Sequence, residues 1–166
     1  MDAIAAVDEN WGIGQNGKLL FSIPADLHYF KKTTWGGLVI MGRRTLDALP
    51  GGRPLPGREH VVLTRGEALA IPGVRTVHTV EQALQAAKSW PGAAWVIGGG
   101  QIYRALLPYC RRAFVTKVEA AGAADTFFPN LEKDPAWHLA QAGRRQAWEG
   151  LCFSFCIYEN RGTAPW

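Results

Sequence analysis

The chain has 166 residues, of which 48% are hydrophobic and 19% charged. This balance predicts one compact globular domain and excludes a disordered chain. No run approaches the roughly 18 consecutive apolar residues of a membrane span, and the N-terminus lacks the basic-then-apolar pattern of a secretory signal. The cysteines are odd in number and show no metal-like spacing to histidines: Cys110, Cys152 and Cys156. They indicate core thiols in a reducing compartment, so we expect a cytoplasmic protein without a metal site or membrane contact.

The net charge is +4, but Lys and Arg form no run or helical stripe, so a nucleic-acid partner is not expected. Several arginines lie instead beside glycines and predicted turns: Arg43, Arg44, Arg53, Arg58 and Arg65. Guanidinium groups placed in this way suit a small ligand that carries phosphates or carboxylates. Ordinary solvated surface charge remains the alternative for most of the eighteen Lys and Arg residues.

Short apolar runs alternate with short helical patterns along the chain, which indicates an α/β fold. In chain order we expect strands at residues 3–7, 38–41, 60–64, 74–77, 94–97, 113–118, 137–141 and 151–158, and helices at residues 24–33, 43–48, 80–88 and 100–107. The runs 38–41 and 94–97 are continuously apolar, which is typical of strands covered on both faces. The last two strands have no clear helix between them and are expected to form an antiparallel hairpin. Residues 162–166 are expected to be a frayed tail.

The first glycine cluster, residues 12–17, fits the pattern G-x-G-x-x-G and follows a predicted strand. A dinucleotide-binding fingerprint also requires a helix that begins at this point and faces the pyrophosphate. Six residues, 18–23, intervene before any helix. We therefore interpret this cluster as a mobile glycine-rich surface loop rather than a Rossmann fingerprint.

The second glycine cluster, Gly98 to Gly100, directly follows a buried strand and begins a helix. Glycines let the backbone approach a ligand closely, and a helix N-terminus supplies free amide donors, so a pyrophosphate fits here. A tight turn without a ligand is the alternative. Two further strand ends, 41–45 and 60–65, also offer Gly, Arg and Thr. Arginines at such strand ends are the usual means of holding a 2′-phosphate, which favours NADPH over NADH.

Asp26 lies in the first turn of the predicted helix 24–33, among apolar neighbours. Pro24 suits the first helical position, and Leu27 and Phe30 share one apolar face. A carboxylate beside such a face must be paired, protonated or bound to a ligand. The alternative is an ordinary first-turn Asp that complements the helix dipole.

Taken together, the motifs resemble those of bacterial dihydrofolate reductases. The matching segments follow the family's order along nearly the whole chain: residues 5–7 with Gly14, 23–27, 39–43, 52–58, 96–103 and 125–129. The resemblance implies an α/β domain over residues 1–161, with a mixed eight-stranded sheet, mostly parallel with an antiparallel C-terminal strand, flanked by four helices. It implies hydride transfer from NADPH to C6 of 7,8-dihydrofolate, with protonation of N5, and antifolate inhibitors as further ligands. A monomer that produces tetrahydrofolate for one-carbon metabolism is expected.

On the substrate side, the resemblance assigns Asp26 to the pterin edge, where it holds N3 and the 2-amino group, and Thr116 to the support of that contact. Arg58 matches the arginine that pairs with the α-carboxylate of the glutamate tail, and Arg53 lies at the rim. The remaining residues expected around the pterin and aminobenzoyl rings are Ile4, Ala5, Leu27, Phe30, Leu49, Leu55 and Ile97.

On the cofactor side, the resemblance assigns Ala6 and Ile13 to the nicotinamide amide and implies a cis peptide bond between Gly98 and Gly99. The glycine cluster at residues 12–17 matches the family's mobile loop over the nicotinamide. The expected contacts with that loop, the phosphates and the adenosine are Gly14, Gly17, Lys18, Gly42, Arg43, Arg44, Thr45, Leu63, Thr64, Arg65, His78, Gly98, Gly99, Gly100, Gln101, Ile102 and Tyr103.

One departure from the family pattern concerns Phe21, which stands where the family usually has tryptophan. An indole can donate a hydrogen bond to water near the pterin, whereas a phenyl ring cannot. We expect Phe21 to keep the ring packing at the catalytic centre but to alter the water network. Leu20 replaces a proline often found beside that tryptophan, which predicts a looser loop end.

Two other functions remain open at this level. A pterin or pyrimidine reductase of the same fold would not need Asp26, Phe30 and Arg58 together. A non-catalytic nucleotide-binding or RNA-binding module is suggested only by the net positive charge, and it predicts salt-dependent binding of nucleic acid without NADPH oxidation.

Overall fold

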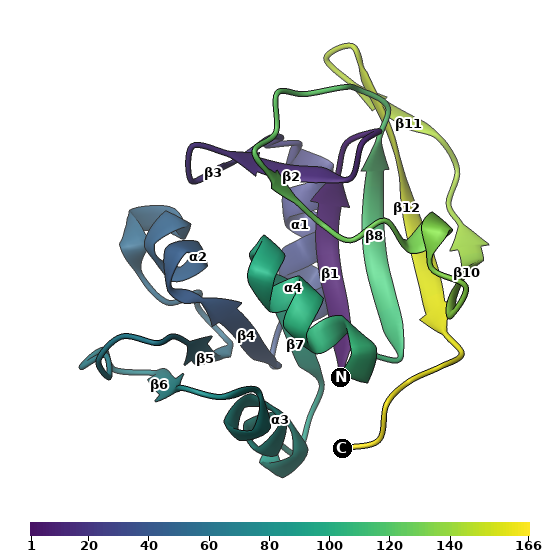
Figure 1. Ribbon diagram of the computed structural model, residues 1–166. Coiled ribbons are helices and arrows are strands. Elements are labelled where there is room, and N and C mark those ends of the chain that lie inside the picture. Colours follow the sequence, from purple (N-terminus) through teal and green to yellow (C-terminus); the bar gives the residue numbers. More distant parts are fainter.

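A twisted central sheet with helices on both faces organises the computed structural model, which describes residues 1–166 (Figure 1). The strands are β1 (Asp2–Val7), β2 (Gly12–Gln15), β3 (Lys18–Leu19), β4 (Leu38–Gly42), β5 (Glu59–Leu63), β6 (Val74–Val77), β7 (Ala94–Gly98), β8 (Arg112–Val118), β9 (Thr126–Phe127), β10 (Trp137–Ala142), β11 (Gln146–Trp148) and β12 (Leu151–Asn160). The α-helices are α1 (Pro24–Thr34), α2 (Arg43–Ala48), α3 (Val80–Ser89) and α4 (Gly100–Leu106), and the 3-10 turns are η1 (Pro50–Gly52), η2 (Leu107–Tyr109) and η3 (Leu131–Lys133).

The main sheet has the strand order β10-β12-β8-β1-β7-β4-β5-β6, and the short β11 pairs with β12. Six strands that are adjacent in the sheet, β8, β1, β7, β4, β5 and β6, are parallel to one another. Strand β12 is antiparallel to β8, β10 and β11. The expected mixed, mostly parallel sheet with an antiparallel C-terminal strand and four helices is therefore confirmed. All eight predicted strands and all four predicted helices are present, with ends that differ by a few residues.

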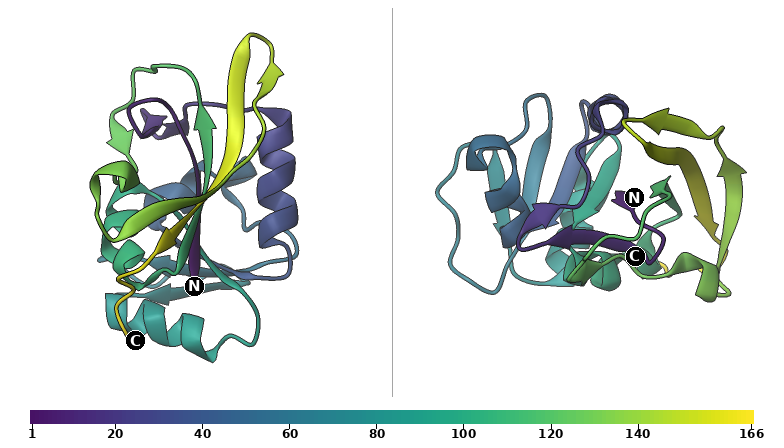
Figure 2. Two further views of the ribbon diagram at one scale, coloured as in Figure 1. Left: turned by 90° about the vertical axis from the view of Figure 1, so that its right-hand side faces the viewer. Right: turned by 90° about the horizontal axis from the view of Figure 1, so that it is seen from above.

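Successive side chains along the strands point to opposite faces of the sheet, and each face carries a hydrophobic core. On one face, Leu38, Ile40 and Val61 pack in the larger core with residues of α3 and α4. On the other face, Val39 and Met41 pack in a smaller core against α1 and α2. Helices α1 and α4 lie on opposite sides of the sheet in the left view of Figure 2.

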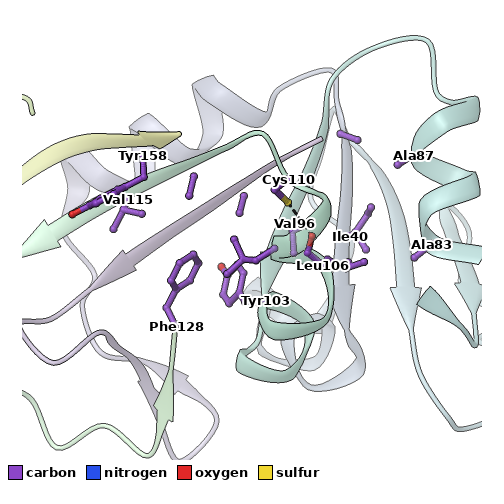
Figure 3. Close-up of a cluster of buried hydrophobic side chains, with 14 of the residues drawn as sticks. Ile40, Ala83, Ala87, Val96, Tyr103, Leu106, Cys110, Val115, Phe128 and Tyr158 are labelled. Carbon is purple, nitrogen blue, oxygen red and sulfur yellow. Dashed lines mark hydrogen bonds between the residues drawn. The ribbon is translucent and has the colours of Figure 1, made fainter. Parts of the chain in front are cut away.

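The larger core joins α3 and α4 to the strands through small and aromatic side chains. In Figure 3, Ala83 and Ala87 of α3 point towards Ile40, and Phe128 lies beside Tyr103 of α4. The rings of Tyr103 and Phe128 have their centroids 4.5 Å apart. Because Phe128 directly follows β9, this contact fixes the small β9 strand against α4.

Residues 12–17, interpreted above as a mobile surface loop, form most of the hairpin β2–β3, so the loop assignment is corrected to a hairpin. Asn16 and Gly17 both have positive φ, 52° and 75°, which is the backbone of a two-residue type I′ turn. Strand β9 adds to the hairpin as a third strand, separate from the main sheet. The Asn-Gly pair favours such a turn strongly, and the mobility of the hairpin stays a prediction.

The C-terminal segment after β12 is irregular, but it is hydrogen-bonded to the domain rather than frayed. The amide of Ala164 donates to Pro108 O at 2.8 Å, and the Trp166 indole donates to Tyr109 O at 3.0 Å. These bonds join residues 162–166 to η2. None of the helices has both the length and the apolar character that crossing a membrane would require.

Candidate active site

The residues predicted to contact a cofactor follow one edge of the parallel sheet. Carboxyl ends of parallel strands meet at a common edge, and the strand order β1-β7-β4-β5-β6 sets their sequence along it. The residues at these ends are, in spatial order, Ala6 on β1, Gly98 to Gly100 after β7, Gly42 to Thr45 after β4, Thr64 and Arg65 after β5, and His78 after β6. Four strand spacings make this row about 19 Å long. A long, extended ligand fits such a row better than a compact one.

Two short helices begin side by side in this row, and neither has a side-chain cap. The N-cap residues are Gly42 for α2 and Gly99 for α4, and neither makes a side-chain cap hydrogen bond. The first amides of both helices are therefore available to an anion. The peptide bond between Gly98 and Gly99 is cis, as the resemblance implied.

Glycines in this row allow close packing as well as ligand access. A Cβ on Gly42 would lie 3.1 Å from Ile102 Cγ1, and one on Gly100 would lie 3.0 Å from Phe127 O. These two glycines let α4 approach β4 and β9. A Cβ on Gly99 would meet only Thr45 Oγ1, at 3.6 Å, so it would project into open space between the two helix N-termini.

Cations and hydroxyls gather at the β4–β6 end of the row. Arg44 and Arg65 are exposed and form no ion pair, whereas the Arg43 Nε lies 3.1 Å from Asp47 Oδ1. His78 Nδ1 lies 2.9 Å from Thr64 O, which ties the ends of β5 and β6 together. Unpaired guanidinium groups at this end are the feature that a 2′-phosphate requires.

The Asp26 carboxylate is fixed on the other side of β1 from this row. The Thr116 hydroxyl, 2% exposed on β8, donates a hydrogen bond of 2.6 Å to Asp26 Oδ1. Burial raises the pKa of Asp26 above its ordinary value, and the Thr116 hydrogen bond opposes this rise. No cation lies within ion-pair distance of the carboxylate. A half-buried carboxylate without a cation is suited to bind donor groups of a ligand, which is more than a helix-dipole Asp needs.

The apolar residues predicted for the substrate site fall into two hydrophobic clusters. Ile4 of β1 belongs to the smaller core, and Phe30, Leu49 and Ile97 pack against that core. Leu27 follows Asp26 on α1 and is 46% exposed despite its apolar side chain. Phe21 is half-buried against Ile23, Val118 and Phe153. Four of the predicted wall residues thus share one core on the face of the sheet that α1 covers, and the exposed Leu27 leaves one apolar surface uncovered.

Arg58 lies beyond α1 on the segment between η1 and β5, and its guanidinium is held in place. Nε donates to Pro56 O at 2.9 Å, and Nη1 donates to Thr34 Oγ1 at 3.2 Å. The guanidinium carbon lies 5.5 Å from the ring centroid of Trp35. Neither Arg58 nor the exposed Arg53 forms an ion pair. Leu55, on the same segment, is half-buried.

The sequence reasoning missed the residues that hold these groups in place. Thr34 and Trp35 position the Arg58 guanidinium, and no sequence motif predicts these two contacts. Asp125 accepts a hydrogen bond of 2.9 Å from the Asn16 amide, and its own amide donates to Gly14 O at 2.9 Å. These bonds tie the β2–β3 hairpin, with Ile13, Gly14, Gly17 and Lys18, to β9. The Asn16-Gly17 pair was the one signal that could have located the hairpin.

The fold and this constellation define an α/β nucleotide-binding protein with one anchored carboxylate near an anion-binding edge of the sheet. A family model described as dihydrofolate reductase matches residues 1–160. The dihydrofolate reductase of Bacillus subtilis (strain 168) is 34% identical over 163 residues, which cover 97% of this chain and 95% of that protein. The dihydrofolate reductase of Neisseria gonorrhoeae is 35% identical over 155 residues and covers 93% and 94%. The chain belongs to the dihydrofolate reductase family.

A solved structure supports the same assignment at the level of the fold. The structure of dihydrofolate reductase from Enterococcus faecalis, complexed with NADP(H) and RAB-propyl, superimposes with a TM-score of 0.87 at 30% sequence identity. The match covers 96% of this chain and 95% of that one. The similarity therefore extends over nearly the whole chain.

Proposed function

We propose that this protein reduces 7,8-dihydrofolate to tetrahydrofolate with NADPH. The observation that carries the proposal is the half-buried Asp26 carboxylate, fixed by a hydrogen bond from the Thr116 hydroxyl. Family membership over residues 1–160 and the NADP(H)-bound neighbour support the same reaction. Bound NADPH supplies the hydride for C6 of the substrate.

Asp26 is the group that orients the pterin and stabilises its charged form. An ionised carboxylate accepts two hydrogen bonds, and the N3 and 2-amino hydrogens of the pterin form a matching pair of donors. Thr116 donates to Oδ1 and so fixes the orientation of the carboxylate before the ligand binds. Asp26 holds the pterin at the edge remote from N5, so water is the proximate proton donor for N5. Arg58 holds the α-carboxylate of the glutamate tail.

The residues of the strand-end row fit NADPH, whose phosphates need donors and whose 2′-phosphate needs a cation. The uncapped amides of α2 and α4 and the hydroxyl of Thr45 would hold the pyrophosphate, and Arg44 and Arg65 would hold the 2′-phosphate. The hairpin that carries Ile13 and Gly14 would bind the nicotinamide end. Antifolate inhibitors that carry the same donor pair as the pterin would bind Asp26 in the same way.

One assay tests the proposed function directly. Loss of NADPH absorbance should require added dihydrofolate, and NADH should support a much slower reaction because it offers no phosphate to Arg44 and Arg65. NADPH oxidation with other pterins or pyrimidines, but not with dihydrofolate, would favour a different reductase of this fold. Binding of RNA without any oxidation would favour a non-catalytic module.

Gly99→Ala tests the phosphate cradle. The new methyl group would fill the space between the N-termini of α2 and α4 without a steric clash inside the protein, because φ at Gly99 is −89°. We expect Kd for NADPH, measured by fluorescence titration, to rise at least about tenfold with little change in Tm. Gly162→Ala makes the same exchange far from the row and should leave Kd unchanged. Unchanged NADPH affinity in Gly99→Ala would place the pyrophosphate elsewhere.

Phe21→Trp tests the departure from the family pattern. The Phe21 ring packs at the border of the Ile23, Val118 and Phe153 cluster, so a larger ring has partly exposed space to occupy. We expect the added indole N–H to order water beside the pterin and to raise kcat by a few fold, roughly the effect of one hydrogen bond. Steady-state kinetics at saturating NADPH give the answer, and an unchanged or lower kcat would show that Phe21 costs this enzyme no rate.

We also propose that the enzyme is cytoplasmic and acts as a monomer. Cys110, Cys152 and Cys156 are all free thiols, which suits a reducing compartment. Fractionation of cells and sedimentation of the purified protein test the two statements.

A further inference from the structure

His60 is a buried histidine on β5 with no assigned role in the reaction. Its side chain is 1% exposed, and its register partners across the sheet are the apolar Val39 on β4 and Val74 on β6. The Leu55 amide donates a hydrogen bond of 2.8 Å to His60 Nε2. A backbone amide can only donate, so Nε2 must carry the lone pair and the ring proton must lie on Nδ1.

This hydrogen bond anchors a segment that has few other anchors. Residues 54–56 are Pro-Leu-Pro, and proline has no amide hydrogen, so Leu55 holds the only backbone donor among the three. The segment is attached on its other side by the bond from the Gly36 amide to Gly57 O, at 2.8 Å. Removal of the His60 acceptor would leave the segment attached at its far end, through Gly57 O and the Arg58 side chain, and would free the part that carries Leu55.

Only the neutral imidazole can make this bond. Protonation turns Nε2 into a donor that faces the Leu55 amide, so attraction is replaced by repulsion between two N–H groups. Burial lowers the pKa of His60 below its ordinary 6.5, and the Arg58 charge adds to the lowering. The Arg58 backbone and the Glu59 charge oppose it. The imidazole is thus neutral at physiological pH and charged only in acid.

We propose that neutral His60 is a positioning residue that shapes the segment 53–58 to hold the aminobenzoyl-glutamate part of the substrate, and that this hold loosens when the imidazole is protonated. The inference rests on the proposed function for the identity of the ligand. Its geometric part, a bond between His60 and Leu55 that breaks in acid, stands without any ligand.

The ligand-free part is tested by NMR on the free enzyme. The imidazole nitrogen shifts of His60 should report the Nδ1–H tautomer at about pH 7.5, and the Leu55 amide should be protected from exchange. As the pH falls, the protection factor of Leu55 should drop in step with the titration of His60. In His60→Gln, whose amide oxygen reaches the position of Nε2 and accepts without titrating, Leu55 protection should not follow this course. A Leu55 amide that is unprotected at neutral pH, or insensitive to the state of His60, would overturn the proposal.

The ligand part is tested by the affinity that the glutamate tail adds. Dihydropteroate lacks this tail, so the ratio of Kd for dihydropteroate to Kd for dihydrofolate, both measured without NADPH, reports that added affinity. His60→Leu should reduce this ratio on the order of tenfold at about pH 7.5. Wild type should show a similar fall once the pH lies below the His60 pKa found in the NMR titration, and His60→Gln should not. His138→Gln, on the distant β10, should behave as wild type. Equal ratios in wild type and His60→Gln above and below that pKa would overturn the proposal, even if dihydrofolate is reduced normally. A protein that fails to reduce dihydrofolate would instead contradict the proposed function and leave the NMR result standing.

Discussion

Replacing Asp26 by Asn is expected to lower kcat near neutral pH by about 10²–10³-fold, while Kd for NADPH stays the same. The asparagine keeps the size of the side chain and an acceptor for Thr116, but it removes the negative charge that stabilises the protonated pterin. In acid, solvent protonates the pterin more readily, so part of the lost rate should return. Steady-state kinetics from acid to neutral pH measure both effects.

Asp134→Asn is the matched control, because it makes the same chemical change at an exposed carboxylate whose one hydrogen bond is local, to the Ala136 amide. It should leave kcat unchanged over the whole pH range. Turnover at pH 7 equal to wild type in Asp26→Asn would remove Asp26 from the centre of the reaction.

The Asp26→Asn variant should also be more stable than wild type at neutral pH. Burial raises the pKa of Asp26 above the ordinary 3.8, so the folded state binds the proton more tightly than the unfolded chain. The free energy of unfolding therefore falls as pH rises from 3.8 through the higher folded pKa, and it stays lower above that value. Asparagine removes this penalty. Tm of Asp26→Asn should exceed that of wild type at pH 7, and the gap should close in acid; a lower Tm at pH 7 would contradict this account.

The parallel part of the fold was predictable because its signals are local and strong. Buried runs such as 38–41 and 94–97 are apolar throughout, and helix α3 carries a cap at Thr79 whose side chain accepts from the Gln82 amide at 3.1 Å. The short strands β2, β3, β9 and β11 were missed. They have between two and four residues each, too few to show a period, and β9 is a strand only because the hairpin pairs with it.

The residues of the candidate site were predictable, but not all of the side-chain contacts that hold them in place. Asp26 and Arg58 stand within recognisable motifs, so the resemblance could assign them. The resemblance also named Thr116, which holds Asp26 from 90 residues away, but no motif pointed to Thr34, which holds Arg58 from 24 residues away. Such pairings are set by the strand order and by packing, which local sequence does not encode.

Arg58 illustrates how packing prepares a binding group. Of its five N–H donors, one at Nε is bonded to Pro56 O and one at Nη1 to Thr34 Oγ1. Three donors, one at Nη1 and two at Nη2, remain free on a guanidinium that lies over the Trp35 ring. This arrangement leaves the geometry needed for a two-point contact with a carboxylate and reduces the entropy lost when the contact forms.

Arg58→Lys is therefore expected to raise KM for dihydrofolate by about 10–100-fold, the effect of one charge-assisted hydrogen bond, with kcat and Kd for NADPH nearly unchanged. Lysine keeps the charge but loses the planar group, the bond to Thr34 and the second contact with the ligand. Arg145→Lys, at an exposed ion pair with Glu119, should have no effect on KM. The decisive comparison uses dihydropteroate, which lacks the glutamate. If Arg58 binds the tail, wild type and Arg58→Lys should use dihydropteroate equally well, because the partner of the arginine is already missing. An equal loss on both substrates would instead show that Arg58 acts by shaping the segment that carries Leu55, not by contact with the carboxylate.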